Sequence, residues 1–523
     1  MSGGRVRFRA LAWVAIAALL VSSARAEVRL NRLFTDHMVL QREMLAPVWG
    51  WADPGERVSV QFAGQSATAV AGPDGKWMAR LGPFAASSSG RNLVVTGKNT
   101  LTVTDVLVGD VWLGSGQSNM EFAMRDVKNS KDEIAGADKP LIRLFTVPRS
   151  EKSQLADDVD SNWVVCRPDT VRDFSAVLYL FGREINAESQ VPIGLIHSSV
   201  GGTRIELWTA PEGFATVPEF ADAVPGIEAA ERQYREQILP KALPQLEGWI
   251  ARTKAALANG TRVPVTPDWP DHPRLGNSGL YLGMIHPLVP FGLRGVAWYQ
   301  GEWNGGENDI YVRRMQALIA GWRQVWNRPD LPFYYVQLAR MPQKDDPPWL
   351  GDGLSPTREA QRKSLAIPHT GMAVIIDLPG DSGWHPRNKQ DVARRLSLWA
   401  LHNEYGRKDL VFSGPLYREM TVEEDRIRLR FDSIGSGLMA GSKNGLEPVK
   451  PAPDQPLKEF AVAGANRKWV LAEARIDGAD VVVSSPEVPH PVAVRYAYCN
   501  DPEGANLYNK EGLPASPFRT DDW

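Results

Sequence analysis

Polar side chains follow four apolar runs of the sequence, at the point where each run ends. The four polar segments are 114–120, 197–204, 300–304 and 377–385. Apolar runs of this kind are typical of buried parallel strands, whose carboxyl ends meet at the edge of the sheet where α/β proteins bind ligands. We therefore expect Ser118 of the first segment and His385 of the fourth to lie close together. A serine hydroxyl beside an imidazole base is a nucleophile that can attack a carbonyl carbon.

A histidine base of this kind needs a carboxylate that sets its tautomer. Asp381, four residues before His385, is the predicted acid, and Asp377 is an alternative to it. Glu302 has three alternative roles: it replaces these aspartates as the acid, contacts a sugar substrate, or binds backbone N–H groups in a structural role.

The pair Gly201-Gly202 follows a strand-like run, so its backbone N–H groups could face a developing oxyanion. The side chain of Asn304 or Gln300 could add a further donor. Preorganised donors typically lower an acyl-transfer barrier by about 3 kcal/mol each. A plain turn explains the two glycines equally well when they are taken alone.

Each of these residues also has a simpler structural explanation. Ser118 could be a helix N-cap, the commonest role of serine at a strand-to-helix turn. It also lacks the G-x-S-x-G pattern of the α/β-hydrolases, because Met120 stands where glycine would be. Three other histidines compete with His385 for the role of base: His197, His286 and His369.

Metal and cofactor chemistry find little support in the sequence. The Gly114-x-Gly116 pattern could open a dinucleotide loop, but Asn119 replaces its third glycine. There is no H-E-x-x-H motif, EF-hand loop, CxxC pair or P-loop. We therefore expect a reaction without metal or cofactor.

The chain has 523 residues, of which 43% are hydrophobic, enough for two or three globular domains. Its formal charge is −2, and the segment after residue 26 is more acidic, with 55 Lys and Arg against 61 Asp and Glu. An acidic protein is a poor candidate for binding nucleic acid or an anionic membrane surface.

Residues 1–26 have the pattern of a secretory signal. Arginines precede an apolar run at 10–21, and Ala24-Arg25-Ala26 supplies an A-x-A cleavage site. We expect cleavage near Ala26, export, and no membrane span in the mature protein. Export permits a disulfide between Cys166 and Cys499, but the sequence leaves their pairing open, as it does the oligomeric state.

The pattern of strand-like and helix-like segments along the chain predicts three regions after the signal. Residues 27–104 alternate short strand-like runs with turns and predict a β-sandwich. Residues 105–413 alternate strands and helices and predict an α/β fold with a doubly wound, mostly parallel sheet in three layers, interrupted by a helical insertion at about 210–275. Residues 414–523 are again β-rich. The predicted strands of the central region are 106–113, 192–196, 293–299, 333–338 and 372–376, and the predicted helices are 176–187, 311–326 and 387–402.

Taken together, the polar segments resemble the sialate O-acetylesterase family, a carbohydrate-esterase branch of the SGNH-hydrolase superfamily. The resemblance covers nearly the whole chain after residue 26. Its most specific motif is Gly116-Gln117-Ser118-Asn119-Met120. The other matching segments are 33–42, 48–52, 201–203 with 208–209, Tyr281 with 283–285, 298–302 with Asn304, 358–361, 385–390 and 506–509.

The resemblance implies that Ser118 is the nucleophile and His385 its general base. Backbone N–H groups of Ser118 and Gly202, or Gly201, with an Asn or Gln side chain, would hold the oxyanion. The reaction would pass through an acetyl-enzyme and release acetate.

This sequence departs from the family pattern at several positions. Gly383 stands where an Asp is common, which leaves the identity of the acid open. Trp303 and Trp384 replace smaller residues and could stack on sugar rings or only pack the rim. Arg204 could pair with a substrate carboxylate or form a salt bridge with Glu206.

The sequence thus predicts an exported serine esterase that removes O-acetyl groups from carbohydrates. The alternatives are an acetyl-xylan or other polysaccharide acetylesterase of the same mechanism, a catalytically inactive carbohydrate-binding relative, and an esterase or lipase that acts on other esters. The polar composition of 210–275 counts against a lipase lid.

Overall fold

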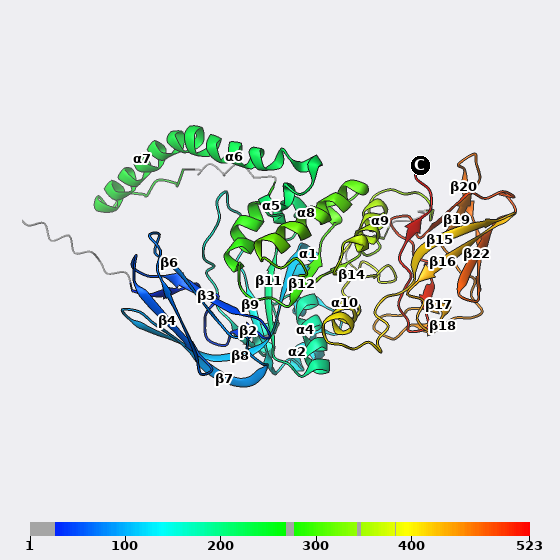
Figure 1. The fold of residues 1–523 in the computed structure, drawn as a ribbon. Coiled ribbons are helices and arrows are strands. Elements are labelled where there is room, and N and C mark those ends of the chain that lie inside the picture. Colours follow the sequence, from blue (N-terminus) through cyan, green and yellow to red (C-terminus); the bar gives the residue numbers. More distant parts are fainter. Residues whose placement is uncertain (1–26, 268–276, 343–346, 382) are drawn as a thin grey trace, which may run out of the picture.

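The fold was taken from a computed structural model, which describes residues 27–267, 277–342, 347–381 and 383–523. Three regions lie in a row (Figure 1): N-terminal strands, a central α/β region and C-terminal strands. The predicted signal at 1–26 lies outside the described residues.

The central region is built on a sheet whose strands follow the order β10-β9-β11-β8-β12-β13-β14. Every neighbouring pair along this path is parallel except β10 and β9. From β8, β11 adds on one side and β12, β13 and β14 on the other, so the polar ends of four predicted strands reach one edge. The bounds are β8 Thr100–Gly116, β9 Lys139–Thr146, β10 Val164–Cys166, β11 Ile193–Ser199, β12 Gly295–Tyr299, β13 Phe333–Val336 and β14 Thr370–Ala373.

Helices cover both faces of this sheet. On one face, Leu318 and Trp322 of α8 pack in a core with Val296 and Trp298 of β12. On the other, α4 and α10 contribute to a second core. These helices confirm the three predicted from the sequence. Their bounds are α4 Ala176–Ser189, α8 Asp309–Val325 and α10 Lys389–Glu404.

The strand β8 is shared between the central sheet and the N-terminal region. Its first half pairs with β7 and β2, and its second half, from Asp110 on, pairs with β11 and β12. At the change of partners the buried Asp110 carboxylate accepts hydrogen bonds from Gln41 (2.8 Å) and Arg42 (3.0 Å). One continuous strand therefore runs through the predicted boundary at 104/105.

The N-terminal region has two layers of strands. One is the sheet β1-β3-β6, and the other consists of β2, β4, β5, β7 and the first half of β8. The bounds are β1 Arg29–Leu30, β2 Val39–Gln41, β3 Ala46–Trp51, β4 Arg57–Phe62, β5 Gln65–Val70, β6 Lys76–Leu81 and β7 Ser87–Thr96.

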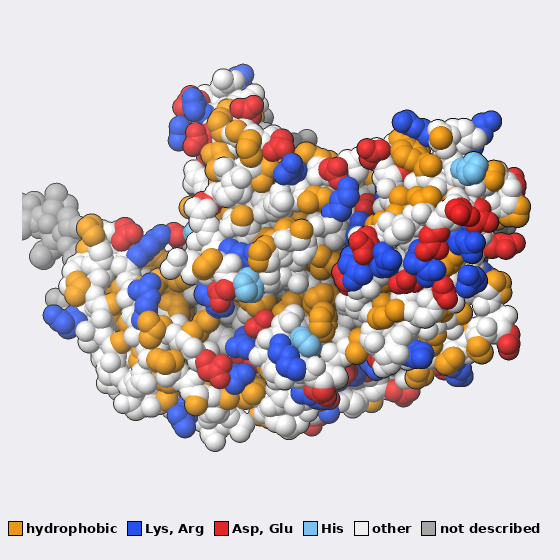
Figure 2. Space-filling view, turned by 45° about the vertical axis from the view of Figure 1, so that its right-hand side comes forward, with side chains coloured by type: hydrophobic (Ala, Val, Ile, Leu, Met, Phe, Trp, Pro, Cys, Tyr) orange, Lys and Arg blue, Asp and Glu red, His pale blue; other side chains and the backbone are white. Residues whose placement is uncertain are grey.

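The C-terminal region contains three further sheets around their own apolar core. Acidic and basic side chains lie side by side over this region (Figure 2), as in the ion pair of Arg428 with Glu423. The bounds are β15 Leu416–Glu423, β16 Arg426–Asp432, β17 Leu438–Ser442, β18 Lys450–Pro451, β19 Phe460–Ala463, β20 Trp469–Leu471, β21 Glu473–Asp477, β22 Asp480–Ser484, β23 Ala493–Tyr496, β24 Leu507–Asn509 and β25 Phe518–Arg519.

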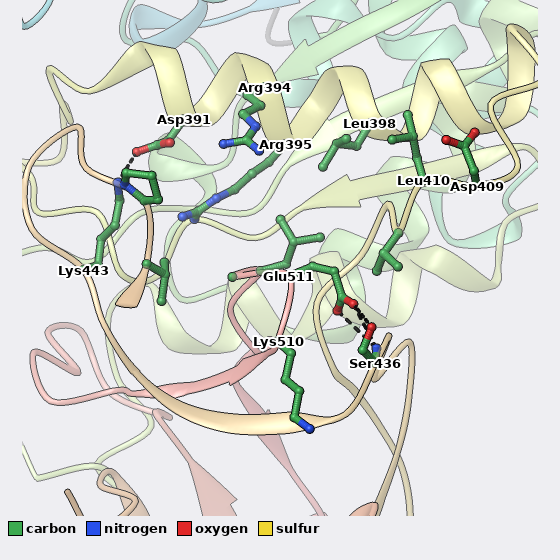
Figure 3. A pocket seen from close by; sticks show the side chains of 15 residues that line it. Asp391, Arg394, Arg395, Leu398, Asp409, Leu410, Ser436, Lys443, Lys510 and Glu511 are labelled. Atoms are coloured by element: carbon green, nitrogen blue, oxygen red, sulfur yellow. Dashed lines mark hydrogen bonds and ion pairs between the residues drawn. The ribbon is translucent and has the colours of Figure 1, made fainter. Parts of the chain in front are cut away.

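Helix α10 also packs against the C-terminal region. A cavity of about 500 Å³ lies between them, where Asp391 of α10 binds Lys443 (2.6 Å) and Glu511 binds Ser436 (Figure 3). The Lys443 side chain is nearly buried. The helix that follows His385 is therefore held by the central sheet and by the C-terminal strands.

The predicted insertion forms a helical arm that extends from the central region above the N-terminal strands (Figure 1). It consists of α6 Ala223–Gln233, a π-helical turn η4 Tyr234–Ile238 and α7 Leu239–Ala258. Residues 268–275 of the predicted insertion lie outside the described residues. In the described part of the chain no helix combines the length and hydropathy that a bilayer span requires.

Shorter helices connect the larger elements. They are α1 Ser118–Glu121, η1 Met124–Asp126, α2 Ser130–Ala135, α3 Pro168–Val171, η2 Ile205–Trp208, α5 Pro211–Phe214, η3 Pro218–Phe220, η5 Tyr281–Ile285, η6 His286–Leu288, η7 Glu302–Asn304, α9 Ser355–Lys363 and η8 Ser364–Ala366.

The strand β9 was not among the predicted strands. Pro140 and Arg143 interrupt its apolar run, yet Arg143 is buried, because its guanidinium binds the Asp105 carboxylate (2.7 Å) and the carbonyl oxygen of Pro140 (3.0 Å). Cys166 and Cys499, whose pairing was open, are buried and are not joined by a disulfide.

We expect Gly109→Ala to destabilise the protein by about 3 kcal/mol, the upper range for overpacking a close contact. Gly109 lies where β8 changes partners, and a Cβ there would come 1.9 Å from the carbonyl oxygen of Pro192. Urea denaturation measures the loss. Gly226→Ala in α6 is the control, because its Cβ would meet no atom within 4 Å. Equal denaturation midpoints for the two variants would contradict this account.

Candidate active site

The structure brings Ser118 and His385 into contact. Ser118 begins α1, one residue after the end of β8, and its Oγ lies 2.8 Å from Nε2 of His385. Gly116 has a φ of +137°, and a Cβ there would come 2.1 Å from the carbonyl oxygen of Tyr299. The turn that presents Ser118 therefore requires glycine at this position.

The predicted acid, Asp381, does not hydrogen-bond to His385. Its carboxylate accepts a hydrogen bond from the backbone N–H of Arg387 (2.9 Å) and forms an ion pair with Lys128 (3.2 Å). Asp381 thus joins the start of the loop that carries His385 to Arg387, two residues after the histidine. The structure gives this carboxylate a contact with the loop backbone in place of one with the imidazole ring.

The alternative acids are also engaged elsewhere. The side chain of Asp377 is buried and binds the guanidinium of Arg395 through both oxygens (2.5 and 2.8 Å). Glu302 accepts hydrogen bonds from the side-chain amides of Gln117 and Asn119. Burial raises the pKa of the Glu302 carboxyl, while these two hydrogen bonds act in the opposite direction. Neither carboxylate hydrogen-bonds to the imidazole of His385.

The segment after β11 lies directly against the serine. A Cβ on Gly201 would be 3.3 Å from Cβ of Ser118, so the close approach depends on glycine. The backbone N–H of Gly201 donates to the Glu121 carboxylate (2.6 Å). Among the described residues, nothing accepts the backbone N–H of Ser118 or of Gly202. Two of the predicted oxyanion donors are therefore available, and that of Gly201 is occupied.

The two predicted side-chain donors are buried and bound to other groups. The amide of Gln300 donates to the carbonyl oxygen of Thr203 (3.1 Å) and to Oδ1 of Asn304 (2.8 Å). The amide of Asn304 donates to Glu206 (3.1 Å) and Glu307 (3.3 Å), and its Oδ1 also accepts the N–H of Ile205. These two residues hold the segment after β11 in place, with no amide proton left over for an oxyanion.

Two tryptophans flank the serine and histidine. Trp303 is 56% exposed, and its indole Nε1 lies 3.2 Å from where a Cβ on Gly202 would be. Trp384, next to His385 in the chain, is 41% exposed. Arg204 binds Glu206, Glu307 and the carbonyl oxygen of Trp303, so its charge is neutralised by neighbours.

The competing histidines have other partners. His197 is buried beside Ser199 Oγ (2.6 Å), and burial lowers its pKa to about 4. His286 contacts the carbonyl oxygen of Ala156, and His369 lies in the turn before β14. Among the four histidines considered, the contact with Ser118 is made by His385.

Sequence reasoning missed Glu121. Because α1 is a single helical turn, a residue three positions after Ser118 lies on the same side of it. That spacing marks Glu121 as a neighbour of the serine, but its bond to Gly201 joins segments 80 residues apart and requires the fold.

An α/β sheet with a serine–histidine pair, open backbone donors and exposed indoles at its carboxyl edge has the features of a carboxylic ester hydrolase. Comparison with known proteins agrees. A family model described as carbohydrate esterase, sialic acid-specific acetylesterase, matches residues 277–391. The chain is similar to the sialate O-acetylesterase of Rattus norvegicus, with 33% identity over 92% of each protein.

It is also similar to the sialate O-acetylesterase of Homo sapiens, with 32% identity over 95% of this chain and 93% of the relative. The structure resembles that of a carbohydrate acetylesterase from Xanthomonas citri, with a TM-score of 0.77 and 35% identity over 95% of this chain and all of the other. The protein belongs to the sialate O-acetylesterase family.

We expect Glu121→Ala to lower kcat for an aryl acetate by about tenfold, because the segment bearing Gly202 loses its link to α1. Glu121→Gln keeps an oxygen that can accept the Gly201 N–H, so its kcat should stay within about threefold of the wild type. Steady-state hydrolysis rates measure both. A rise in kcat for the alanine variant would show instead that the carboxylate obstructs the oxyanion position.

Proposed function

We propose that this protein is an exported serine esterase that removes O-acetyl groups from carbohydrates. The 2.8 Å contact between Ser118 Oγ and His385 Nε2 carries the proposal. It lies at the carboxyl edge of a parallel sheet, in a chain of the sialate O-acetylesterase family. We assign the central region to a doubly wound, SGNH-type catalytic domain on the same grounds.

In the proposed reaction, Nε2 of His385 takes the hydroxyl proton while Oγ of Ser118 attacks the acetyl carbonyl carbon. The backbone N–H groups of Ser118 and Gly202 hold the oxyanion. The tetrahedral adduct collapses to an acetyl-enzyme as His385 returns the proton to the departing sugar oxygen. Water, activated by His385, then attacks the acetyl-enzyme and releases acetate.

We propose that Asp381 supports the base indirectly. Its hydrogen bond to the N–H of Arg387 holds the chain two residues after His385, and its ion pair with Lys128 anchors the same loop. A loop held in this way keeps the imidazole within reach of Ser118.

Acetylated neutral polysaccharide is a second candidate substrate beside acetylated sialic acid. Arg204, which could have paired with a substrate carboxylate, is already neutralised by Glu206 and Glu307. The exposed indoles of Trp303 and Trp384 offer flat surfaces that suit sugar rings of either kind. The proposed export rests on residues 1–26, which lie outside the described residues.

The test is acetate release by the purified protein from 9-O-acetylated sialic acid and from acetylated xylan. We expect Ser118→Ala to lower the rate by about 10⁴-fold. The preferred substrate chooses between sialate and neutral polysaccharide. If the wild type releases no acetate from either substrate or from an aryl acetate but still binds sugar, the protein is a carbohydrate-binding relative.

Asp381 either holds the loop that carries His385 or acts directly on the imidazole ring, and these two roles predict different activities for its variants. Asp381→Asn keeps an acceptor for the Arg387 N–H, so kcat should fall by only about threefold, whereas Asp381→Ala should cost about 30-fold. His385→Ala, as reference, should cost about 10⁴-fold. A loss in Asp381→Asn equal to that in His385→Ala would show that this carboxylate acts on the ring itself.

A further inference from the structure

A fully buried lysine lies next to the serine–histidine pair. Lys389 is the first residue of α10, four positions after His385, and no part of it is exposed. The Asn388 side chain caps the helix by accepting the N–H of Asp391 (3.0 Å). A cation in the first turn of a helix opposes the helix dipole, so this position does not favour lysine for helix stability.

The Lys389 ammonium donates to Oδ1 of Asn119, the residue after Ser118. The rings of Phe122 and Tyr299 lie 4.7 and 5.3 Å from Nζ. Within the described part of the chain it forms no direct ion pair. A buried ammonium with one amide oxygen as its hydrogen-bond partner is costly, and such groups usually serve a specific purpose.

The amide group of Asn119 connects Lys389 with the segment that carries His385. Its Nδ2 donates to Glu302 (2.6 Å) and to the carbonyl oxygen of Trp384 (2.9 Å), the residue before His385. Glu302 also accepts from Gln117, the residue before Ser118. The same buried network therefore binds the chain on both sides of the nucleophile and immediately before the base.

We propose that Lys389 is a positioning residue that orients the Asn119 amide, which in turn holds the His385 segment against Ser118. The ammonium polarises this amide, so its N–H groups donate more strongly to Glu302 and to Trp384. The inference rests on the proposed function, because it concerns the geometry of that reaction.

The electrostatics of the network agree with this role. Burial lowers the pKa of Lys389 to about 7, while the carboxylates of Glu302 and Asp381 act in the opposite direction. Burial raises the pKa of Glu302. Burial thus disfavours the charged form of both groups, while the charge of each favours that of the other, so loss of one leaves the other poorly compensated.

The experiment compares Lys389→Met with Lys443→Met, using an aryl acetate and the full chain. Lys443 is a matched control: it is also nearly buried and its ammonium also binds α10, through Asp391 (2.6 Å), in the cavity of Figure 3. For Lys389→Met we expect kcat to fall about 100-fold with KM within about threefold of the wild type. For Lys443→Met we expect both constants to stay within about twofold.

A double variant separates positioning from charge balance and guards against misfolding. Lys389→Met with Glu302→Gln removes both buried charges, so it should fold more readily than the single variant. If Lys389 positions Asn119, kcat of the double variant stays low. Recovery of kcat to near the wild-type value would show that Lys389 only balances Glu302, and would overturn the proposal.

Two further outcomes are decisive. If folded Lys389→Met keeps kcat within about threefold of the wild type, or loses no more than Lys443→Met, the positioning role is wrong while the proposed function stands. If the wild type shows no hydrolysis that depends on Ser118, the proposed function fails first and the inference fails with it.

Discussion

The structure depends on one continuous strand, β8, that belongs to two sheets. Its first half completes the N-terminal layer and its second half is an inner strand of the central sheet, which ends at the turn before Ser118. The buried Asp110, held by Gln41 and Arg42, marks the exchange of partners. The position of the serine is therefore set by the packing of both regions, and neither region can shift along β8 alone.

At the carboxyl edge of that sheet, the limiting requirement is that buried polar groups find partners. Asn119, Gln300 and Asn304 are fully buried, and each of their amide groups joins two segments that are distant in sequence. An unpaired buried amide would cost about 2 kcal/mol, so these bonds hold the segments in place. The N–H groups of Ser118 and Gly202 are left without a protein acceptor in the described part of the chain, as an oxyanion site requires.

The sequence predicted those features that depend on local pattern. Apolar runs predicted the strands β8, β11, β12, β13 and β14, and the polar clusters that follow four of these runs predicted the contact of Ser118 with His385. The strand β9 could not be predicted, because the burial of Arg143 depends on Asp105, 38 residues earlier. The same limit applies to Asp381, Gln300 and Asn304. Residue type indicated that they could act as acid or donors, but each of them also binds a residue of a distant segment: Lys128, Thr203 and Glu206, respectively.

The two indoles at the rim also give the site an optical property. The chain has 18 tryptophans, yet among those in the described residues only Trp303 and Trp384 stand out as strongly exposed. A soluble quencher such as iodide reaches exposed indoles far more readily than buried ones. Iodide should therefore quench these two indoles beside Ser118 and His385 more strongly than the buried ones, and a ring stacked there would shield them. The protein carries a reporter of site occupancy that needs no label and no turnover.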